Sequence, residues 1–500
     1  MDAFSNLYHG FETALSFTNV YLCFVGCLWG SLVGVLPGIG PLAGIAILLP
    51  ATYGLDATGA LIMLAGIYYS TMYGGSTTSI LMNIPGETAS VVTCFDGYQM
   101  TKKGRAGAAL FIAAWGSWIG GTLSIVGLML LAPQLATFAM KFGPPEMFGI
   151  LLVTFVLVTT LGSGSFLQNM AMILVGLLCG LVGMDSLSGN LRFTFGSVDL
   201  YEGLGIVPIT MGALGIGEIL SATRETMIRD VYKPRLRELF PNRAELRASW
   251  APVLRGTGLG FFLGLIPSGR VLCSFVSYMV EKRLANRPEE FGTGRVEGVA
   301  GPETANNAAT GAAMIPFTAL GIPTGPAIAI MMAVLLLHGV RPGPLFIKEQ
   351  PEIFWSLIAS MYFGNVISVI LNLPMVGIFV SLLRIPFRIL FPIILLICVI
   401  GVYSVNLNTF DLFILLAAGV FGYFLQKLGY SIAPFTLAFI LGPMVEEAFR
   451  QSLIRGAGSF SIFWHSPIAL TFILFSCLLF LWNIFRSLRP GKQVLVEEET

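Results

Sequence analysis

The chain consists of long uninterrupted runs of hydrophobic residues separated by short polar segments. The runs at 148–161, 391–405 and 468–485 approach the roughly 20 apolar residues that a helix needs to cross a bilayer. The alternating apolar and polar positions of membrane β-barrel strands are not seen. The pattern therefore predicts an all-α polytopic membrane protein with about 12 membrane segments.

Composition agrees with this prediction and excludes other classes. Charged residues make up 11% of the chain, against about 25% in soluble domains, and the net charge is +1. No basic patch with interleaved aromatic residues points to a nucleic-acid partner. Cys23 and Cys27 share a helix face but have no histidine nearby in the sequence, so we interpret them as small core residues. No cofactor is expected.

Lysine and arginine positions orient the chain. None precedes Lys102, so the charged region of a cleavable signal peptide is missing and we expect the first spans to be retained. Basic residues cluster at 102–105, 224–255, 384–388 and 486–492, which the positive-inside rule places in the cytoplasm together with the C-terminus. The segments 132–146 and 183–203 are then expected to face outward.

The chain also divides into two related halves. Residues 224–255 contain eight basic and four acidic residues, and we predict that they form a cytoplasmic linker. It separates a first transmembrane repeat (1–223) from a second (256–485), with a cytoplasmic tail at 486–500. The motif "GSLVGVLPGIG" at 30–40 returns as "GFFLGLIPSGR" at 260–270, and "MNIPGE" at 82–87 is answered by "LGIPTG" at 320–325.

The two repeats are predicted to have inverted topology. The first half begins outside and reaches the cytoplasm by Lys102, whereas the second begins in the cytoplasm. Inverted repeats with broken helices or re-entrant hairpins are typical of transporters, whose substrates bind near the membrane midplane. Glycine pairs such as Gly30 and Gly34 are also explained by close helix packing alone, and this alternative stays open.

Proline and glycine interrupt the apolar runs near residues 37, 85, 267 and 323. Such breaks expose helix N-termini, which attract anions, and unwound carbonyls, which coordinate cations. Hydroxyl and amide side chains cluster around them. The predicted substrate-binding residues are Gly38, Ser76, Thr77, Asn83, Pro85, Gly86, Asn306, Asn307, Thr310, Pro323, Thr324 and Gly325. Asn83 and Asn306 are also the candidate Na⁺ ligands, because an amide offers a hard oxygen without carrying charge.

Several charged residues near these breaks receive simpler interpretations. Glu87, Asp96 and Glu303 have two interpretations, as cation ligands or proton carriers and as solvated loop carboxylates, and we favour the second. Arg270 is the nearest cationic candidate for an anion, and we favour its interpretation as a helix-end or snorkelling arginine. The pair at 446–447 is read as the end of a span, and the histidine at 338 as a helix-end residue. No arrangement typical of a nucleophile or paired catalytic acids is found, so we do not expect an enzyme. A gated anion channel remains an alternative to a transporter.

Four long motifs carry a family resemblance. They are "GVLPGIGPLAGIAILLP" at 34–50, "YYSTMYGGSTTSILMNIPGE" at 68–87, "DGYQMTKKGRAGAAL" at 96–110 and "GPETANNAATGAAMIPFTALGIPTGP" at 301–326. The chain resembles the large membrane subunit, TctA type, of tripartite tricarboxylate transporters from about residue 30 to the last spans. It departs from the family at 321–326, where "GIPTGP" stands in place of the more usual "GIPGS".

The resemblance implies a cation-coupled importer in a bacterial inner membrane, with Na⁺ as the expected coupling ion. Its substrate would be a small tricarboxylate or dicarboxylate such as citrate. It further implies two partners, a small four-span membrane subunit of the TctB type and a periplasmic solute-binding protein of the TctC type, and an elevator-like alternating access.

Overall fold

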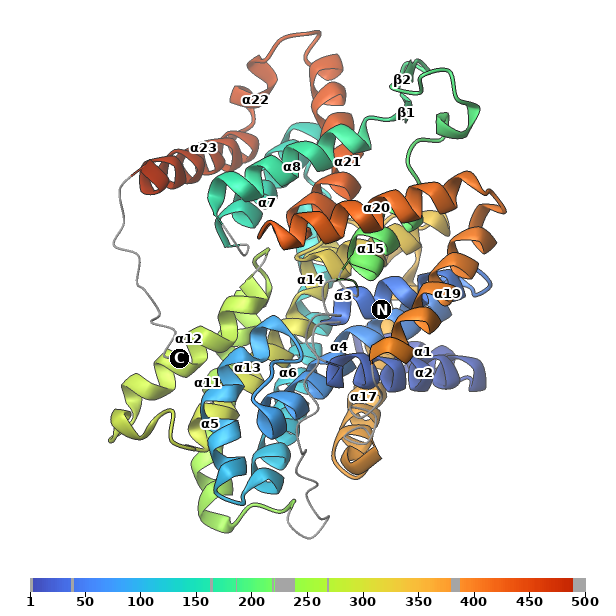
Figure 1. The fold of residues 1–500 in the computed structure, drawn as a ribbon. Coiled ribbons are helices and arrows are strands. Elements are labelled where there is room, and N and C mark those ends of the chain that lie inside the picture. Colours follow the sequence, from blue (N-terminus) through green and yellow to red (C-terminus); the bar gives the residue numbers. More distant parts are fainter. Residues whose placement is uncertain are drawn as a thin grey trace.

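The computed structural model describes residues 3–36, 40–161, 165–185, 187–217, 220, 239–267, 269–378 and 387–488. Helices account for most of them. The strands in this part of the chain form one short antiparallel hairpin, in which β1 (Gly183–Met184) pairs with β2 (Leu191–Arg192). The all-α class predicted from the hydrophobic runs is therefore confirmed (Figure 1).

Helices of the first half follow the expected hydrophobic runs. In chain order they are α1 (Ala3–Ala14), α2 (Phe17–Val35), α3 (Gly40–Leu48), η1 (Leu49–Thr52), α4 (Ala57–Met82), η2 (Thr88–Ser90), α5 (Val91–Lys102), α6 (Ala106–Ala139), α7 (Pro144–Leu161), α8 (Phe166–Gly180), η3 (Val198–Leu200), α9 (Ile206–Thr210) and η4 (Met211–Ile216). The η elements are short 3₁₀ turns, except η4, which continues α9 as a π-helix.

The second half contains α11 (Arg243–Gly264), α12 (Gly269–Leu284), η6 (Pro288–Glu290), α13 (Glu297–Ala312), α14 (Met314–Leu320), α15 (Pro326–Leu337), α16 (Phe346–Glu349), α17 (Pro351–Asn372), α19 (Phe387–Asn406), α20 (Phe410–Lys427), α21 (Ala433–Arg455), α22 (Ser461–His465) and α23 (Pro467–Leu488). The predicted linker boundary at 255 falls inside α11. Residues 224–238 of the linker and 489–500 of the tail lie outside the described residues.

Five of the described helices are long and apolar enough to cross a membrane, namely α2, α6, α17, α20 and residues 467–485 of α23. Helix α23 exposes the most apolar surface, with Leu478 at 67% and Phe485 at 64% exposure. A contiguous apolar surface of this kind fits a lipid environment. The prediction of a multi-pass membrane protein is supported, while the number of about 12 segments and the inverted orientation stay predictions.

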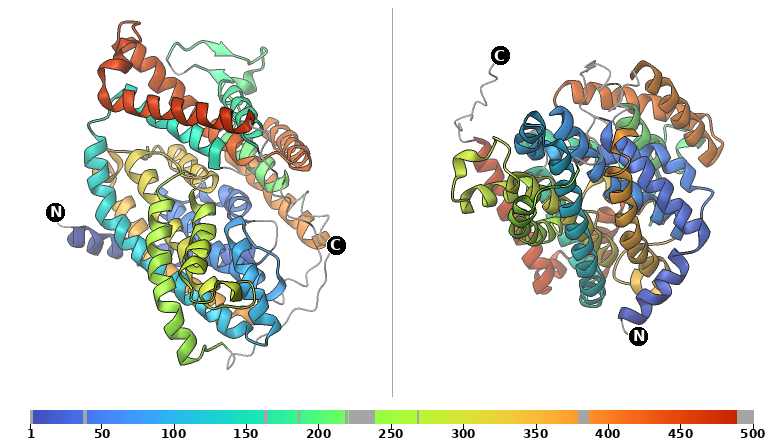
Figure 2. Two further views of the ribbon diagram at one scale, coloured as in Figure 1. Left: turned by 90° about the vertical axis from the view of Figure 1, so that its left-hand side faces the viewer. Right: turned by 90° about the horizontal axis from the view of Figure 1, so that it is seen from below.

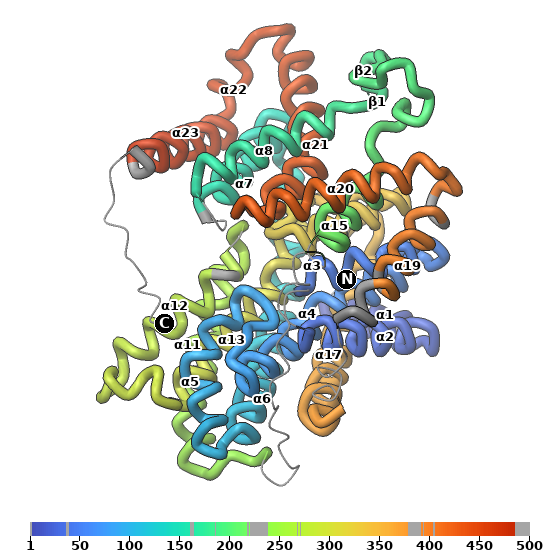
Figure 3. Tube along the Cα trace, in the orientation of Figure 1, coloured from blue at the N-terminus to red at the C-terminus, as the bar shows by residue number. Residues whose placement is uncertain are grey.

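The two halves of the chain interlace. Helices α7 and α8 of the first half pack on α21 and α23 of the second, and together with α22 they form a layer at one end of the molecule (Figures 1 and 2). At the other end α5 and α6 pack on α13, which also contacts α11 and α12. The trace in Figure 3 shows green segments beside red ones in the end layer, and blue segments beside yellow-green ones at the other end. Neither half forms a separate body.

Two helix hairpins, one from each half, are built alike. In α2, a Cβ atom added at every fourth residue would come within 2.5 Å of a carbonyl oxygen of α4, at Gly26, Gly30 and Gly34. In α11 the same holds against α13, at Gly256, Gly260 and Gly264. These positions are related by the same offset of 230 residues that relates the motifs. Glycine is therefore required for close helix packing in both hairpins, which is the alternative explanation of the glycine pairs given above. The equal spacing of these glycines in the two hairpins is also what two related repeats would show.

All four predicted interruptions separate helices: α2 from α3, α4 from η2, α11 from α12, and α14 from α15. Asn83 ends α4 in the left-handed conformation with φ 58°, and Gly321 ends α14 in the same way with φ 70°. Left-handed residues stop a helix because they redirect the backbone away from its axis. The chain leaves each helix inside the protein, where the next helix can begin.

Candidate functional site

The broken ends converge on one cavity of about 640 Å³. Its walls include residues 40–42 at the start of α3, 85–88 in the turn before η2, and 324–328 at the start of α15. Residues 429–434, which lead into α21, and Arg270, the second residue of α12, complete the polar part of the lining. Both halves thus contribute to a single chamber, which we call the central chamber.

Four α-helices, namely α3, α12, α15 and α21, therefore begin at the wall of the central chamber. The first amide groups of a helix have no partner within it, and the helix dipole concentrates positive charge at that end. Pro326 occupies the first position of α15 and Pro434 the second of α21, where the missing amide hydrogen costs no helical bond. Several N-termini facing one cavity make it suited to an anion.

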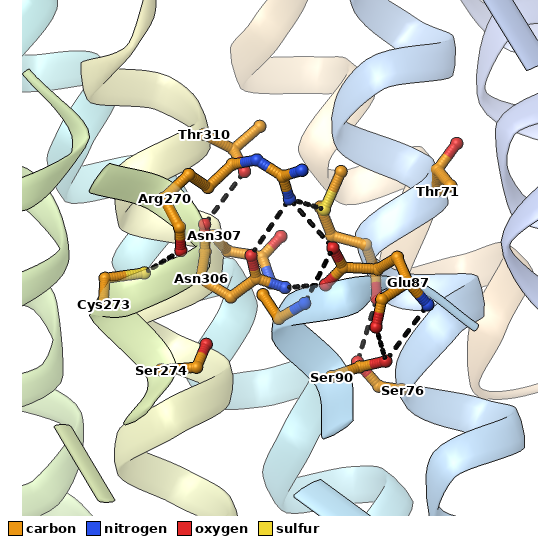
Figure 4. A network of polar contacts seen from close by, with 12 residues as sticks. Thr71, Ser76, Glu87, Ser90, Arg270, Cys273, Ser274, Asn306, Asn307 and Thr310 are labelled. Carbon is orange, nitrogen blue, oxygen red and sulfur yellow. Dashed lines mark hydrogen bonds and ion pairs between the residues drawn. The ribbon is translucent and has the colours of Figure 1, made fainter. Parts of the chain in front are cut away.

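A buried ion pair faces the central chamber. Arg270 Nη1 lies 3.0 Å from Glu87 Oε2, with side-chain exposures of 19% and 1%. Asn306 of α13 donates from Nδ2 to the other carboxylate oxygen of Glu87 at 2.7 Å, and its Oδ1 accepts from Arg270 at 3.4 Å (Figure 4). The guanidinium also stacks over the Tyr68 ring at 5.8 Å. The three polar side chains come from three different segments.

The interpretation of Glu87 as a solvated carboxylate was wrong, whereas Arg270 stands at a helix end, as predicted. Glu87 is buried, because the turn that carries it is pressed against α2 and α4: a Cβ at Gly86 would lie 2.3 Å from the Gly34 carbonyl oxygen. Gly75 makes room for the Glu87 side chain, because a Cβ atom added at Gly75 would lie only 3.1 Å from Glu87 Cγ. Arg270 does begin a helix, yet its side chain points to Glu87. Gly75 was the signal in the sequence for a buried turn.

Glu303 is also buried, at 1% exposure, instead of solvated. Its two carboxylate oxygens contact the hydroxyls of Ser76 on α4 and Thr93 on α5. The sequence around it, "GVAGPETANNAATGA", carries small residues on every side of α13. A helix of that kind packs closely with neighbours all round, which explains why a carboxylate at its centre is enclosed.

Residues 20–437 match the model of the tripartite tricarboxylate transporter TctA family. The chain belongs to this family. Every residue that lines the central chamber, from Gly40 to Leu437, falls within the matched region. The resemblance noted from the four motifs is thereby confirmed.

Two relatives come from Agrobacterium vitis. An "Uncharacterized 52.8 kDa protein in TAR-I ttuC' 3'region" is 47% identical over 501 residues, covering the whole of both chains. An "Uncharacterized protein in TAR-II ttuC' 3'region" is 44% identical over 242 residues, which cover 48% of this chain and all of the relative. No solved structure matches this TctA-family chain.

The structure brings many of the predicted site residues to the central chamber or directly behind it. Pro85, Gly86, Thr324 and Gly325 line it. Asn306 does not line the chamber but donates a hydrogen bond to Glu87, which does. The others lie behind it: Asn307 donates from Nδ2 to Ser117 Oγ at 2.7 Å, Thr310 bonds to the carbonyl of its own turn, and Pro323 is buried outside the lining. Ser76 and Thr77 border a separate small cavity of about 10 Å³.

Asn83 lies away from the chamber. Asn83 is exposed where α4 ends, and it lines a separate groove that also contains Lys282. Its left-handed backbone explains its identity, since asparagine tolerates that conformation. The structure thus separates Asn83 from Asn306, the other candidate Na⁺ ligand. Gly38 lies outside the described residues.

Asp96 is enclosed as well, with 0% exposure, and was wrongly expected in solvent. It accepts from the backbone amides of Gly294 and Arg295 at 2.7 Å each, and from that of Gly292 and the Tyr278 hydroxyl. These bonds fasten α5 to the loop before α13. A carboxylate held by several amides and a hydroxyl has a structural role here. The histidine at 338 caps α15, as predicted.

A second ionic cluster lies at the β1–β2 hairpin. Arg450 Nη1 contacts Asp185 at 2.7 Å, and Arg192 contacts Glu446 at 2.7 Å. Hydrogen bonds from the Ser188 hydroxyl and Arg450 lower the pKa of Asp185. Helix α21 continues past Glu446 to Arg455, and the end of a membrane span at 446–447 stays a prediction. The cluster ties the hairpin to α21, remote in sequence from it.

Proposed function

We propose that this chain is the translocating subunit of a tripartite carrier that imports a small carboxylate across a bacterial inner membrane. A small four-span membrane subunit and a periplasmic solute-binding protein, as the family implies, complete the carrier. The binding protein delivers the anion to the central chamber, and a co-transported cation drives uptake. The chain performs no chemical reaction on the substrate.

The observation that carries this proposal is the convergence of four helix N-termini and Arg270 on one chamber. Its volume of about 640 Å³ lies within the usual range for small-molecule sites. Glu87 neutralises the charge of Arg270, so the pair attracts an anion only weakly as a unit. Helix ends and backbone amides then supply most of the attraction, and a bound cation supplies the rest. We expect this cation to be Na⁺.

Alternating access is proposed to be elevator-like. The chamber is lined by the turn at 85–88, by α3, α12 and α15, and by the segment leading into α21. Helix α21 packs in the end layer with α7 and α8, whereas α12 packs with α11 and α13. Sliding of one group against the other would carry the chamber contents across the membrane.

Reconstitution tests the proposal directly. The chain and its four-span partner are placed in proteoliposomes, and uptake of radiolabelled citrate and of a panel of dicarboxylates is measured with and without external binding protein. We expect saturable uptake that requires the binding protein and an inward Na⁺ gradient. Equal flux without binding protein, or flux that does not saturate with concentration, would refute a tripartite carrier and favour a channel.

The inverted topology has its own test, because residues 102, 140, 240 and 345 are exposed. Single cysteines at these positions on a cysteine-free background are labelled with a membrane-impermeant maleimide. We expect 102 and 240 to label from the cytoplasmic side and 140 and 345 from outside. Labelling of 102 and 345 from the same side would exclude inverted repeats.

A further inference from the structure

Behind the central chamber, Glu303 occupies a site without a positive charge. Within the described part of the chain, the hydrogen-bond partners of its carboxylate are two neutral hydroxyls, those of Ser76 and Thr93, and it joins no ion pair. An ionised carboxylate in such surroundings pays a large desolvation cost, which taking up a proton removes. Glu87, by contrast, has Arg270 beside it.

The hydrogen-bond count also favours a neutral Glu303. Ser76 Oγ lies within reach of two acceptors, the Glu303 carboxylate and the Met72 carbonyl oxygen at 2.9 Å. A hydroxyl has one hydrogen to donate. If Glu303 is protonated, it donates to Ser76, and Ser76 donates to Met72. Thr93 then donates to the second oxygen of Glu303, so every polar atom in the chain of bonds has a partner.

Three charged groups on the helices around α13 have partners of their own. On α12, Arg270 pairs with Glu87, and Glu281 pairs with Arg255 of α11 at 2.5 Å. On α5, Asp96 is held by backbone amides and the Tyr278 hydroxyl. Helix α6 has no charged residue between its ends, and α4 and α14 have none at all.

The remaining titratable groups near Glu303 are Tyr73 of α4, whose hydroxyl donates to Asn365, and Cys94 of α5, whose thiol donates to the Ser90 carbonyl oxygen. The surroundings of Glu303 thus contain no free cation among the described residues.

We propose that Glu303 is a proton-binding site and that its proton moves with the carboxylate substrate. This inference rests on the proposed transport function and deepens it, since it adds a proton to the coupling. In each cycle hydronium in the water on the side where substrate enters gives up a proton to the Glu303 carboxylate, and the O–H bond of Glu303 forms. It breaks on the other side, where water accepts the proton and the carboxylate is regenerated.

The position of Glu303 explains how proton and substrate would influence each other. Ser76 and Thr93 lie on either side of the turn at 85–88, which lines the chamber. Glu303 therefore fastens both arms of the α4–α5 hairpin to α13, and its ionisation changes that attachment. In addition, an anion in the chamber disfavours a second negative charge close behind it. By reciprocity the proton favours anion binding, which is the sign required for symport.

Infrared difference spectroscopy tests proton occupancy without any substrate. The purified chain is compared with Glu303→Gln and, as a matched control, Glu87→Gln, in H₂O and D₂O at neutral pH. We expect a deuterium-sensitive C=O band of a carboxylic acid in the wild type that disappears in Glu303→Gln and persists in Glu87→Gln. An unchanged acid band in Glu303→Gln would overturn the assignment.

Coupling is tested in proteoliposomes that contain both partners, with radiolabelled citrate as the probe. Under the same inward Na⁺ gradient in every sample, a pH gradient, acidic on the side of entry, is expected to drive additional accumulation by the wild type. Glu303→Gln should lose this accumulation and keep citrate counterflow, and Glu303→Asp should recover part of it. Full pH-driven accumulation by Glu303→Gln would overturn the coupling role. If the wild type moves no carboxylate, the transport function fails, while the infrared comparison still decides whether Glu303 holds a proton.

Discussion

Replacing both members of the Glu87–Arg270 pair should cost less than the two single replacements added together. The two atoms lie 3.0 Å apart and the side chains are 1% and 19% exposed, so Arg270→Gln leaves an enclosed carboxylate without its cation. Removing one partner of a buried pair typically costs about 3–5 kcal/mol. Glu87→Gln leaves the guanidinium unpaired and should cost a similar amount, whereas the double variant leaves two neutral amides. We expect the double variant to be more stable than the sum of the single losses predicts, by about 1–3 kcal/mol.

The measurement is a double-mutant cycle on the free energy of unfolding in detergent micelles. Arg287 and Glu290 provide a control pair, because Arg287 is 70% exposed and its loss should cost less than about 1 kcal/mol. All chamber variants should also lose citrate uptake. If the single losses at 87 and 270 simply add in the double variant, the two charges do not stabilise each other, and the description of the chamber wall as a coupled pair is refuted.

Three further outcomes follow from the geometry. Gly86→Ala should abolish uptake, because the added Cβ would lie 2.3 Å from the α2 backbone. Gly54→Ala is the control and should keep uptake, because its Cβ would meet nothing within 4 Å. Equal uptake by both variants would contradict the close packing of the turn against α2. Asn306→Ala removes the hydrogen bond to the charged Glu87 carboxylate, and the loss of such a bond costs about 1.5–3 kcal/mol. We expect the apparent affinity for citrate to fall by roughly ten- to a hundredfold. Asn83→Gly is the control, and its citrate affinity should change little. The pKa of Asp185 is lowered in the folded state, so its stabilising effect is present above about pH 4 and is lost as the pH falls toward that lowered value. The difference in melting temperature between wild type and Asp185→Asn should shrink between neutral and acid pH, and a constant difference would show that the ion pairs of Asp185 do not stabilise the hairpin.

Sequence reasoning found the helix breaks and missed the charges beside them. Breaks are local: proline and glycine near residues 37, 85, 267 and 323 interrupt helices wherever they stand, and the structure has helix ends at all four places. Glu87 and Asp96 were assigned to solvent because they precede a basic segment. Whether a carboxylate is enclosed depends on what packs over it, and Gly86 and Gly75 allow α2 and α4 to enclose Glu87.

The sequence by itself determined the all-α membrane class, the interruptions of its helices, the similarity of two hairpins 230 residues apart, and the TctA family, because each follows from composition or from a contiguous motif. Only the tertiary structure decided which polar residues share a site. Glu87 meets Arg270 across 183 residues and Asn306 across 219, and Ser76 meets Glu303 across 227. The charge that a buried group can hold depends on such distant partners, because in a low-dielectric interior a single neighbouring cation decides whether a carboxylate stays ionised.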